Sequence, residues 1–152
     1  MASPSINIMA EHPGPLILSG DEVEIRLGIY EENRPHFNRE SLCDSRVFLN
    51  FHRIFGEPGS PNYDVFLVAH TQGGALHYIG SLSFFSVRPR NPDNNEGMNL
   101  KIKIESPIKE LLGQEAGKRE SLTLQITPQD QADEPIPIEV EFIFLCCIPH
   151  EQ

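Results

Sequence analysis

Alternating apolar and polar residues along the chain predict a mainly β protein. In residues 23–29, four aliphatic side chains alternate with polar residues or glycine. A period of two places the aliphatic side chains on one face of a strand, so that face is expected to be buried. Similar patterns predict six further strands, at residues 47–54, 63–69, 77–87, 100–104, 121–127 and 136–146.

The last predicted strand has one apolar face and one acidic face. Its apolar face is expected to hold Ile138, Val140, Phe142 and Phe144. The opposite face carries Glu139 and Glu141, and charged side chains there are typical of a solvated strand that resists edge-to-edge association. We therefore interpret the two glutamates as a solvated face rather than as an acid–base pair.

Turn-forming residues separate the predicted strands. The Gln-Gly-Gly sequence at residues 72–74 predicts a hairpin turn between strands 63–69 and 77–87. Two polar segments, residues 31–45 and 88–97, predict long loops.

A single short helix is predicted after the strand at residues 100–104. Ser106 suits the N-cap and Pro107 the first helical position, while Gly113 is expected to end the helix. Antiparallel strands with short turns bury one face each and pack together. The fold class is therefore all-β, an antiparallel β-sandwich or jelly-roll-like barrel of about seven strands with one short helix.

The length of 152 residues fits one domain. Residues 1–20 are weakly patterned and contain three prolines, so they are predicted to be an N-terminal lead-in segment. Residues 21–148 form the predicted β-sandwich domain, and residues 149–152 form a C-terminal tail.

The formal net charge of −10 argues against nucleic acid and against an anionic membrane surface as partners, because both need clustered basic residues. No apolar run approaches the roughly 20 residues of a membrane span. The N-terminal residues also lack the pattern of a secretory signal. A full-length chain of this sequence is expected to be soluble and cytoplasmic, whereas the location of a fragment stays unknown.

Three cysteines are present, and an odd number does not suggest a disulfide framework. Adjacent Cys146 and Cys147 would point to opposite faces of a strand, so one is expected in the core and the other at the surface. Together with Met98 and His150 they are candidate ligands of a small copper carrier, since thiolate and thioether groups select Cu(I). This carrier is the last of three functional hypotheses.

No catalytic residue, metal site or cofactor is assigned within the chain. Ser81, Asp64 and either His70 or His77 supply the residue types of a hydrolase triad. However, Ser81 lacks the Gly-x-Ser-x-Gly context that exposes a nucleophile. The two histidines flank the predicted hairpin turn without further metal ligands beside them.

Four short sequence segments resemble the C-terminal domain of plant polyphenol oxidases. Mollusc hemocyanins carry a related sandwich domain. Asn62-Tyr63-Asp64-Val65-Phe66 is similar to that family's Lys-Phe-Asp-Val-Phe string, and His77-Tyr78-Ile79-Gly80-Ser81-Leu82 is similar to its Glu-Phe-Ala-Gly-Ser-Phe strand. The helix at residues 106–112 and the strand at residues 120–128 follow in the family's order. We interpret Tyr63, Asp64, Val65, Phe66, Gly80 and Ser81 as structural, with Asp64 bonded to a turn or a cross-strand partner.

The resemblance implies a non-catalytic accessory domain for a tyrosinase-type copper oxidase, in the same polypeptide or in trans. Copper would then lie only in the partner domain, and this sandwich would cover its entrance and keep the oxidase latent. Candidate residues for an apolar plug are Phe37, Phe55 and Phe85. The second hypothesis is a stand-alone sugar- or protein-binding module that uses loops 31–45 and 88–97.

Overall fold

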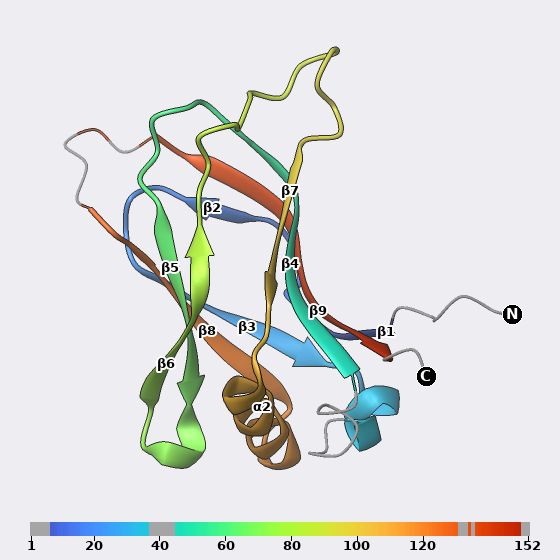
Figure 1. The fold of residues 1–152 in the computed structure, drawn as a ribbon. Helices are drawn as coiled ribbons and strands as arrows, with labels where there is room; N and C mark the ends of the chain where they lie inside the picture. The colour runs from blue at the N-terminus through green and yellow to red at the C-terminus, as the bar shows by residue number, and fades with distance from the viewer. Residues whose placement is uncertain (1–6, 37–44, 131–133, 135, 150–152) are drawn as a thin grey trace, which may run out of the picture.

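The computed structural model describes residues 7–36, 45–130, 134 and 136–149. Within this part of the chain, nine strands, one α-helix and two 3-10 helices form a single antiparallel sheet structure (Figure 1). The elements are β1 (Asn7–Glu11), β2 (Leu16–Leu18), β3 (Val23–Ile29), η1 (Glu31–His36), β4 (Ser45–Gly56), β5 (Tyr63–Ala69), η2 (His70–Gln72), β6 (Ala75–Leu82), β7 (Met98–Lys103), α2 (Ser106–Lys118), β8 (Ser121–Pro128) and β9 (Ile138–Pro149).

The sheet curls until its two outer strands meet. Its strand order is β6-β5-β8-β3-β1-β9-β4-β7, and β2 adds to β9. The outer strands β6 and β7 lie side by side, where Gly80 faces Ile102 (Figure 1). A Cβ atom on Gly80 would lie 2.7 Å from Ile102 Cγ2, so the close approach requires glycine. The expected antiparallel, mainly β fold is therefore confirmed, as a nearly closed barrel.

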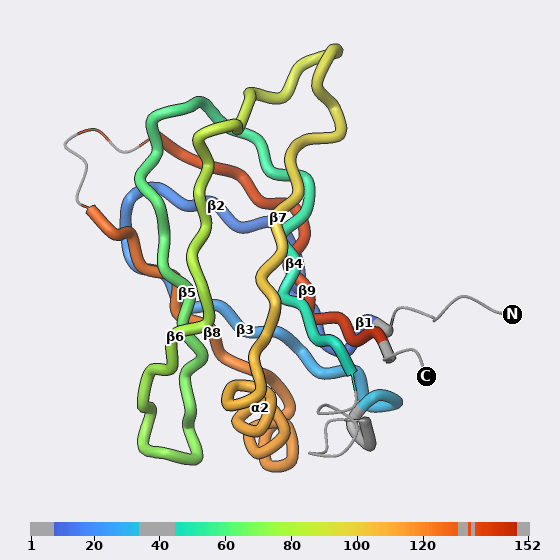
Figure 2. Tube along the Cα trace, in the orientation of Figure 1, coloured from blue at the N-terminus to red at the C-terminus, as the bar shows by residue number. Residues whose placement is uncertain are grey.

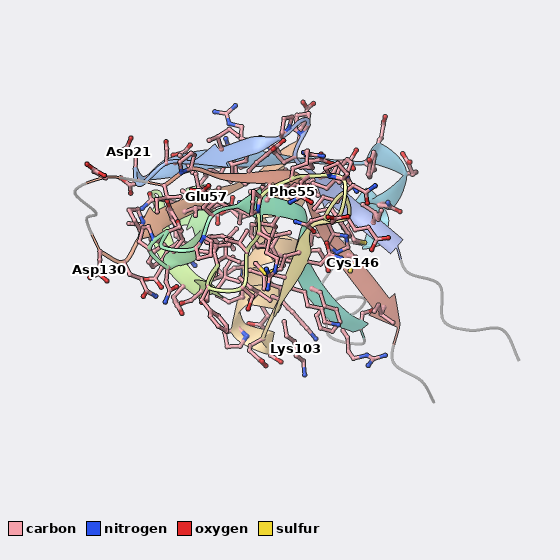
Figure 3. All side chains as sticks on the ribbon, turned by 90° about the horizontal axis from the view of Figure 1, so that it is seen from above. Asp21, Phe55, Glu57, Lys103, Asp130 and Cys146 are labelled. Carbon is pink, nitrogen blue, oxygen red and sulfur yellow. The ribbon has the colours of Figure 1, made fainter. Side chains whose placement is uncertain are left out.

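The interior of the barrel is filled by apolar side chains from nearly every strand (Figure 3). Tyr63 is fully buried, and its ring meets Phe84 edge-on at a centroid distance of 5.9 Å. A buried tyrosine hydroxyl needs a hydrogen-bond partner. Here the amide of Gly20 donates to it at 2.9 Å, which fastens the segment before β3 to the core.

Helix α2 lies at one end of the barrel, beside the β5–β6 hairpin (Figure 2). Its N-cap is Glu105 rather than the predicted Ser106, while Pro107 lies in the first turn as expected. The predicted stop at Gly113 is wrong, because the helix continues to Lys118. Leu112 and Ala116 are buried in the core, so apolar packing carries the helix past the glycine.

The predicted lead-in segment is part of the sheet. Strand β1 pairs with both β3 and β9, and β2 pairs with β9. Met9, Ala10 and Leu18 are completely buried. These strands are five and three residues long and are separated by prolines, so their apolar pattern is too short to recognise locally.

Strands β4 and β9 change their buried face at the pair formed by Arg53 and Glu141. Arg53 has a positive φ of 57°, and the register between β4 and β7 shifts at the same place. Extra residues of this kind in a strand, β-bulges, re-aim the side chains that follow. The prediction that Phe142 and Phe144 share the buried face of Val140 is therefore wrong, since Phe142 is 52% exposed and Phe144 is half-buried.

Two smaller expectations also change. The hairpin at residues 72–74 is confirmed, with Gly73 and Gly74 both in left-handed conformations, but the strand after it ends at Leu82 instead of residue 87. Cys146 and Cys147 are both buried, whereas one was expected at the surface. The predicted tail begins at the last residue of β9, and residues 150–152 lie outside the described residues.

Candidate functional site at the loop end of the barrel

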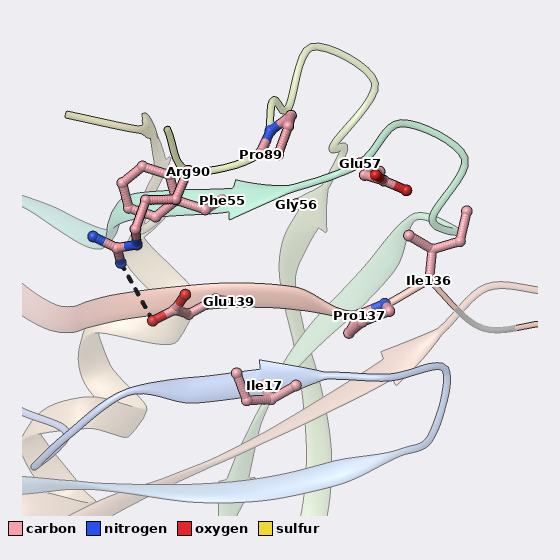
Figure 4. Close-up of a pocket in the computed structure, with 9 residues that line it drawn as sticks. All are labelled: Ile17, Phe55, Gly56, Glu57, Pro89, Arg90, Ile136, Pro137 and Glu139. Atoms are coloured by element: carbon pink, nitrogen blue, oxygen red, sulfur yellow. Dashed lines mark hydrogen bonds and ion pairs between the residues drawn. The ribbon is translucent and has the colours of Figure 1, made fainter. Parts of the chain in front are cut away.

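A pocket of about 340 Å³ opens at the end of the barrel opposite α2, which we call the loop end (Figure 4). It lies between the end of β4, the segment 88–97 and the residues that lead into β9. Its apolar lining consists of Ile17, Phe55, Pro89, Ile136 and Pro137, with Gly56 among them. Its charged lining consists of Glu57, Arg90 and Glu139.

Close backbone contacts hold the segment 88–97 against the end of β4. The Gly56 amide donates a hydrogen bond to the Arg88 carbonyl at 3.0 Å. At the other end of the segment, Gly97 has a φ of +75°, and a Cβ atom there would lie 2.9 Å from Phe55 Cζ. Within the segment, the Asn94 side chain donates to the Pro89 carbonyl at 2.9 Å. The segment predicted as a long loop is thus a folded wall of the pocket.

Charged side chains form a paired cluster beside the pocket. Arg53 Nε donates to Glu141 Oε2 at 2.5 Å, and Arg90 bonds both Glu141 and Glu139, the latter at 3.3 Å. The hydrogen bonds from Arg53 and Arg90 lower the pKa of Glu141, and the bond to Glu141 raises the pKa of Arg90. The Arg90 guanidinium also lies 3.9 Å from the centroid of the Phe55 ring.

The sequence did not indicate this cluster. Glu139 and Glu141 were interpreted as a solvated face, and they are half-buried partners of arginines far away in the sequence. The only local sign was the pair of glutamates itself. The arginine partners come from a bulge in β4 and from the segment 88–97, and neither position follows from strand periodicity.

The three candidate plug residues fall in different environments. Phe55 is 3% exposed and packed under Arg90, so it cannot reach another protein without leaving the core. Phe85 is 83% exposed, in a turn closed by a 3.0 Å hydrogen bond from the Val87 amide to the Phe84 carbonyl. Phe37 lies outside the described residues.

The residues that carry the family strings cluster on β5 and β6. Asp64 pairs with Ser81 across the two strands, and its carboxylate accepts hydrogen bonds from Ser81 at 2.8 Å and from Gln129 at 2.9 Å. Tyr63 and Val65 are core residues on the same strand. The ring of Phe66 meets Tyr78 at a centroid distance of 5.8 Å. These contacts join the strands, in keeping with a structural role.

The candidate copper ligands do not come together. Cys146 lies opposite Phe48 on β4, and Met98 lies opposite Ile54, six residues further along that strand. An extended strand covers roughly 20 Å over that span, which is too far for one metal ion. Burial raises the pKa of Cys146, which disfavours its thiolate, and Asn50 bonds its sulfur at 3.1 Å. His150 lies outside the described residues, which contain no group of three potential metal ligands.

The residues of a hydrolase triad are only partly brought together, because Ser81 meets Asp64 but neither histidine. Ser81 Oγ is bonded to Asp64 and to the Tyr78 hydroxyl. His77 Nε2 lies 2.8 Å from Gln72 Oε1, and His70 Nε2 lies 3.0 Å from Thr123 Oγ1. Neither histidine contacts the serine in the described residues. No helix in the described part of the chain is long and apolar enough to cross a membrane.

The fold matches solved structures of polyphenol oxidases. A recombinant latent aurone synthase (polyphenol oxidase) superposes with a TM-score of 0.54 at 17% identity, over 91% of this chain and 26% of that one. A latent apple tyrosinase gives a TM-score of 0.52 at 14% identity, over 88% of this chain and 27% of that one. At these sequence identities the structural similarity establishes the fold. It confirms, at the level of the fold, the expected resemblance to the C-terminal domain of polyphenol oxidases.

This chain therefore spans about a quarter of the length of the oxidases it matches. A search of curated proteins finds no match. A protein-family model described as "Domain of unknown function (DUF7868)" matches residues 5–146. Because the match covers nearly the whole barrel, the chain belongs to this DUF7868 family.

Proposed function

We propose that this chain is a non-catalytic accessory domain that covers the active site of a tyrosinase-type copper oxidase. The copper ions and the catalytic residues belong to the oxidase domain, in the same polypeptide or in a separate chain. Two observations support the proposal. The matched oxidases are described as latent forms, and the barrel corresponds to 26–27% of each of them.

The exposed ring of Phe85 carries the proposal. A phenylalanine that is 83% exposed leaves most of its apolar surface in water, and burying it in a cleft would contribute about 2 kcal/mol. Its neighbours Phe84 and Val87 are 1% and 0% exposed, so they anchor both ends of the turn in the core. An anchored turn loses little conformational entropy on binding, which favours insertion into a preformed cleft.

Shielding follows from steric exclusion. An aromatic ring at the entrance of a copper site occupies the volume that a phenolic ring would need, and the rest of the docked domain keeps substrate from entering beside it. Removal or displacement of the domain would then open the site. In this scheme the accessory domain supplies shape and apolar contact, and takes no part in electron or proton transfer.

The test is inhibition in trans of the type 3 copper oxidase from the same organism, prepared as its catalytic core. Oxidation of a catechol is followed by absorbance while the chain is titrated in. We expect saturable inhibition by the wild-type chain, and at least tenfold weaker inhibition by Phe85→Ser, about the effect of losing one buried aromatic contact.

Phe142→Ala is the matched control, because Phe142 is also exposed, at 52%, but lies on β9 away from the Phe84–Val87 turn. The free energy of unfolding of both variants is expected to lie within about 0.5 kcal/mol of the wild-type value, because substitutions at exposed positions usually have small effects on stability. Equal inhibition by wild type and Phe85→Ser would exclude Phe85 as the plug. No inhibition and no complex with the wild-type chain would overturn the proposed function itself.

A further inference from the structure

We propose that the loop-end pocket is a binding site for a small organic cation, in which an apolar ring or branched chain carries a positive charge at one end. The proposal rests on the lining and charge of the pocket alone. It does not depend on the proposed shielding function, and it uses none of the residues of the Phe85 turn.

The size and floor of the pocket suit one apolar group. Its volume of about 340 Å³ lies at the lower end of the range of ligand pockets, roughly 300–1,000 Å³. The floor combines Ile17, Ile136 and two prolines, all of which lack charge, with the Phe55 ring, which Arg90 covers (Figure 4). Ile17 is 51% exposed, so part of this apolar surface is left in water by the fold.

The charges around the pocket favour a cation. Glu57 and Glu139 line it directly, and Glu57 is exposed, with no ion-pair partner among the residues that the structure describes. Arg90 is already engaged by Glu139 and Glu141, and Arg53 is engaged by Glu141. The lining itself therefore holds two carboxylates, Glu57 and Glu139, and one guanidinium group, Arg90, which leaves one net negative charge at the pocket. The chain as a whole carries −10, so its field also repels anions.

The wall that meets the ligand is already in position. Arg90 lies over the Phe55 ring and is held by two carboxylates. Gly97 allows the segment 88–97 to approach β4, and the Gly56 amide bonds the Arg88 carbonyl in that segment. A wall fixed by these contacts needs little rearrangement to bind a ligand, and preorganisation of this kind raises affinity.

The same chemistry is offered by a free arylalkylamine and by a peptide with an apolar side chain next to a lysine. Three probes of similar shape and different charge test how much the positive charge contributes to binding. Phenethylamine is cationic, 2-phenylethanol is neutral and 3-phenylpropionate is anionic. Binding is measured by amide chemical shifts of the ¹⁵N-labelled chain, with attention to Gly56, Glu57 and Arg90.

We expect phenethylamine to bind about fivefold more tightly than 2-phenylethanol, because one exposed ion pair contributes about that much affinity. We expect 3-phenylpropionate to bind most weakly. Glu57→Gln should remove the preference for the amine over the alcohol. Glu96→Gln is the matched control, because Glu96 is exposed on the segment 88–97 but does not line the pocket. Ile17→Ala should weaken all three probes.

The peptide acetyl-Gly-Phe-Lys-Gly-amide distinguishes the two sources of the ligand. Binding about tenfold tighter than phenethylamine assigns the site to a polypeptide, whereas equal or weaker binding assigns it to a free amine. The proposal is overturned if the three probes bind equally, if Glu57→Gln leaves the preference intact, or if the shifts fall outside the pocket.

Discussion

The carboxylate of Glu115 on α2 accepts two hydrogen bonds from Thr71, one from its backbone amide and one from its hydroxyl, both at 2.9 Å. Glu115 is only 1% exposed. Thr71 lies in η2, at the tip of the β5–β6 hairpin. One side chain therefore fastens that tip to the helix that covers the end of the barrel.

Replacing Glu115 by Ala is expected to lower the free energy of unfolding by about 2–3 kcal/mol, because two hydrogen bonds to a charged group are lost in a buried place. Glu115→Gln keeps an acceptor oxygen and should cost about 1 kcal/mol. Urea denaturation followed by circular dichroism measures both. Gln114→Ala on the exposed face of the helix serves as the control. An alanine variant as stable as the wild type would show that the hairpin tip does not need this contact.

The contact between Gly80 and Ile102 predicts a coupled pair of substitutions. A Cβ atom at Gly80 would lie 2.7 Å from Ile102 Cγ2, so Gly80→Ala should destabilise the barrel by about 1–3 kcal/mol through overpacking. Adding Ile102→Ala makes room, and the double variant should lose about 1 kcal/mol less than the sum of the single losses.

The control for this pair is Gly28→Ala on β3. A Cβ atom there meets only the Glu11 carbonyl oxygen, at an ordinary 3.8 Å, so the substitution should be neutral or slightly stabilising. Strictly additive losses at Gly80 and Ile102 in a double-mutant cycle would contradict a direct contact between β6 and β7.

The lowered pKa of Glu141 predicts a pH dependence of stability. Hydrogen bonds from Arg53 and Arg90 favour the carboxylate, so the folded state holds the pKa below its ordinary value of 4.5. A depressed folded-state pKa contributes stability above pH 4.5, and that contribution is lost as the pH falls through the folded-state pKa. Glu141→Gln should therefore be less stable than the wild type at pH 7, and the difference should shrink below pH 4.

Urea unfolding of both proteins between pH 7 and pH 3 tests this dependence. Glu96→Gln, at an exposed position outside the cluster, should show no such trend. A constant difference between wild type and Glu141→Gln across the pH range would mean that the ion pairs do not stabilise the fold.

Strands with a regular pattern were predictable from the sequence. Strand β3 was predicted at the residues where it lies, because four aliphatic side chains keep the period of two without interruption. Strand β5 likewise has its predicted bounds. The fold class and the resemblance to the polyphenol oxidase domain followed from such strands, together with the turn residues between them.

The rest depended on contacts that no local pattern contains. The bulge at Arg53 changes which face of β4 and β9 is buried. Strict alternation along β9 therefore assigns Phe142 to the buried face, where it does not lie. The pocket combines residues from β2, β4, the segment 88–97 and the approach to β9. Its ion pairs join residues 49 to 88 positions apart in the sequence, a separation that only the closed barrel brings together.

The position of β1 between β3 and β9 has a consequence for biosynthesis. Within the described part of this domain, the first strand in chain order is hydrogen-bonded to the last one, so the sheet stays open until almost the whole domain has been translated. Contacts between distant parts of a chain also slow folding, since the intervening loop must close first. A nascent chain stalled before β9 would therefore expose β1 as an unpaired edge, and chaperone capture of such chains should end when β9 emerges.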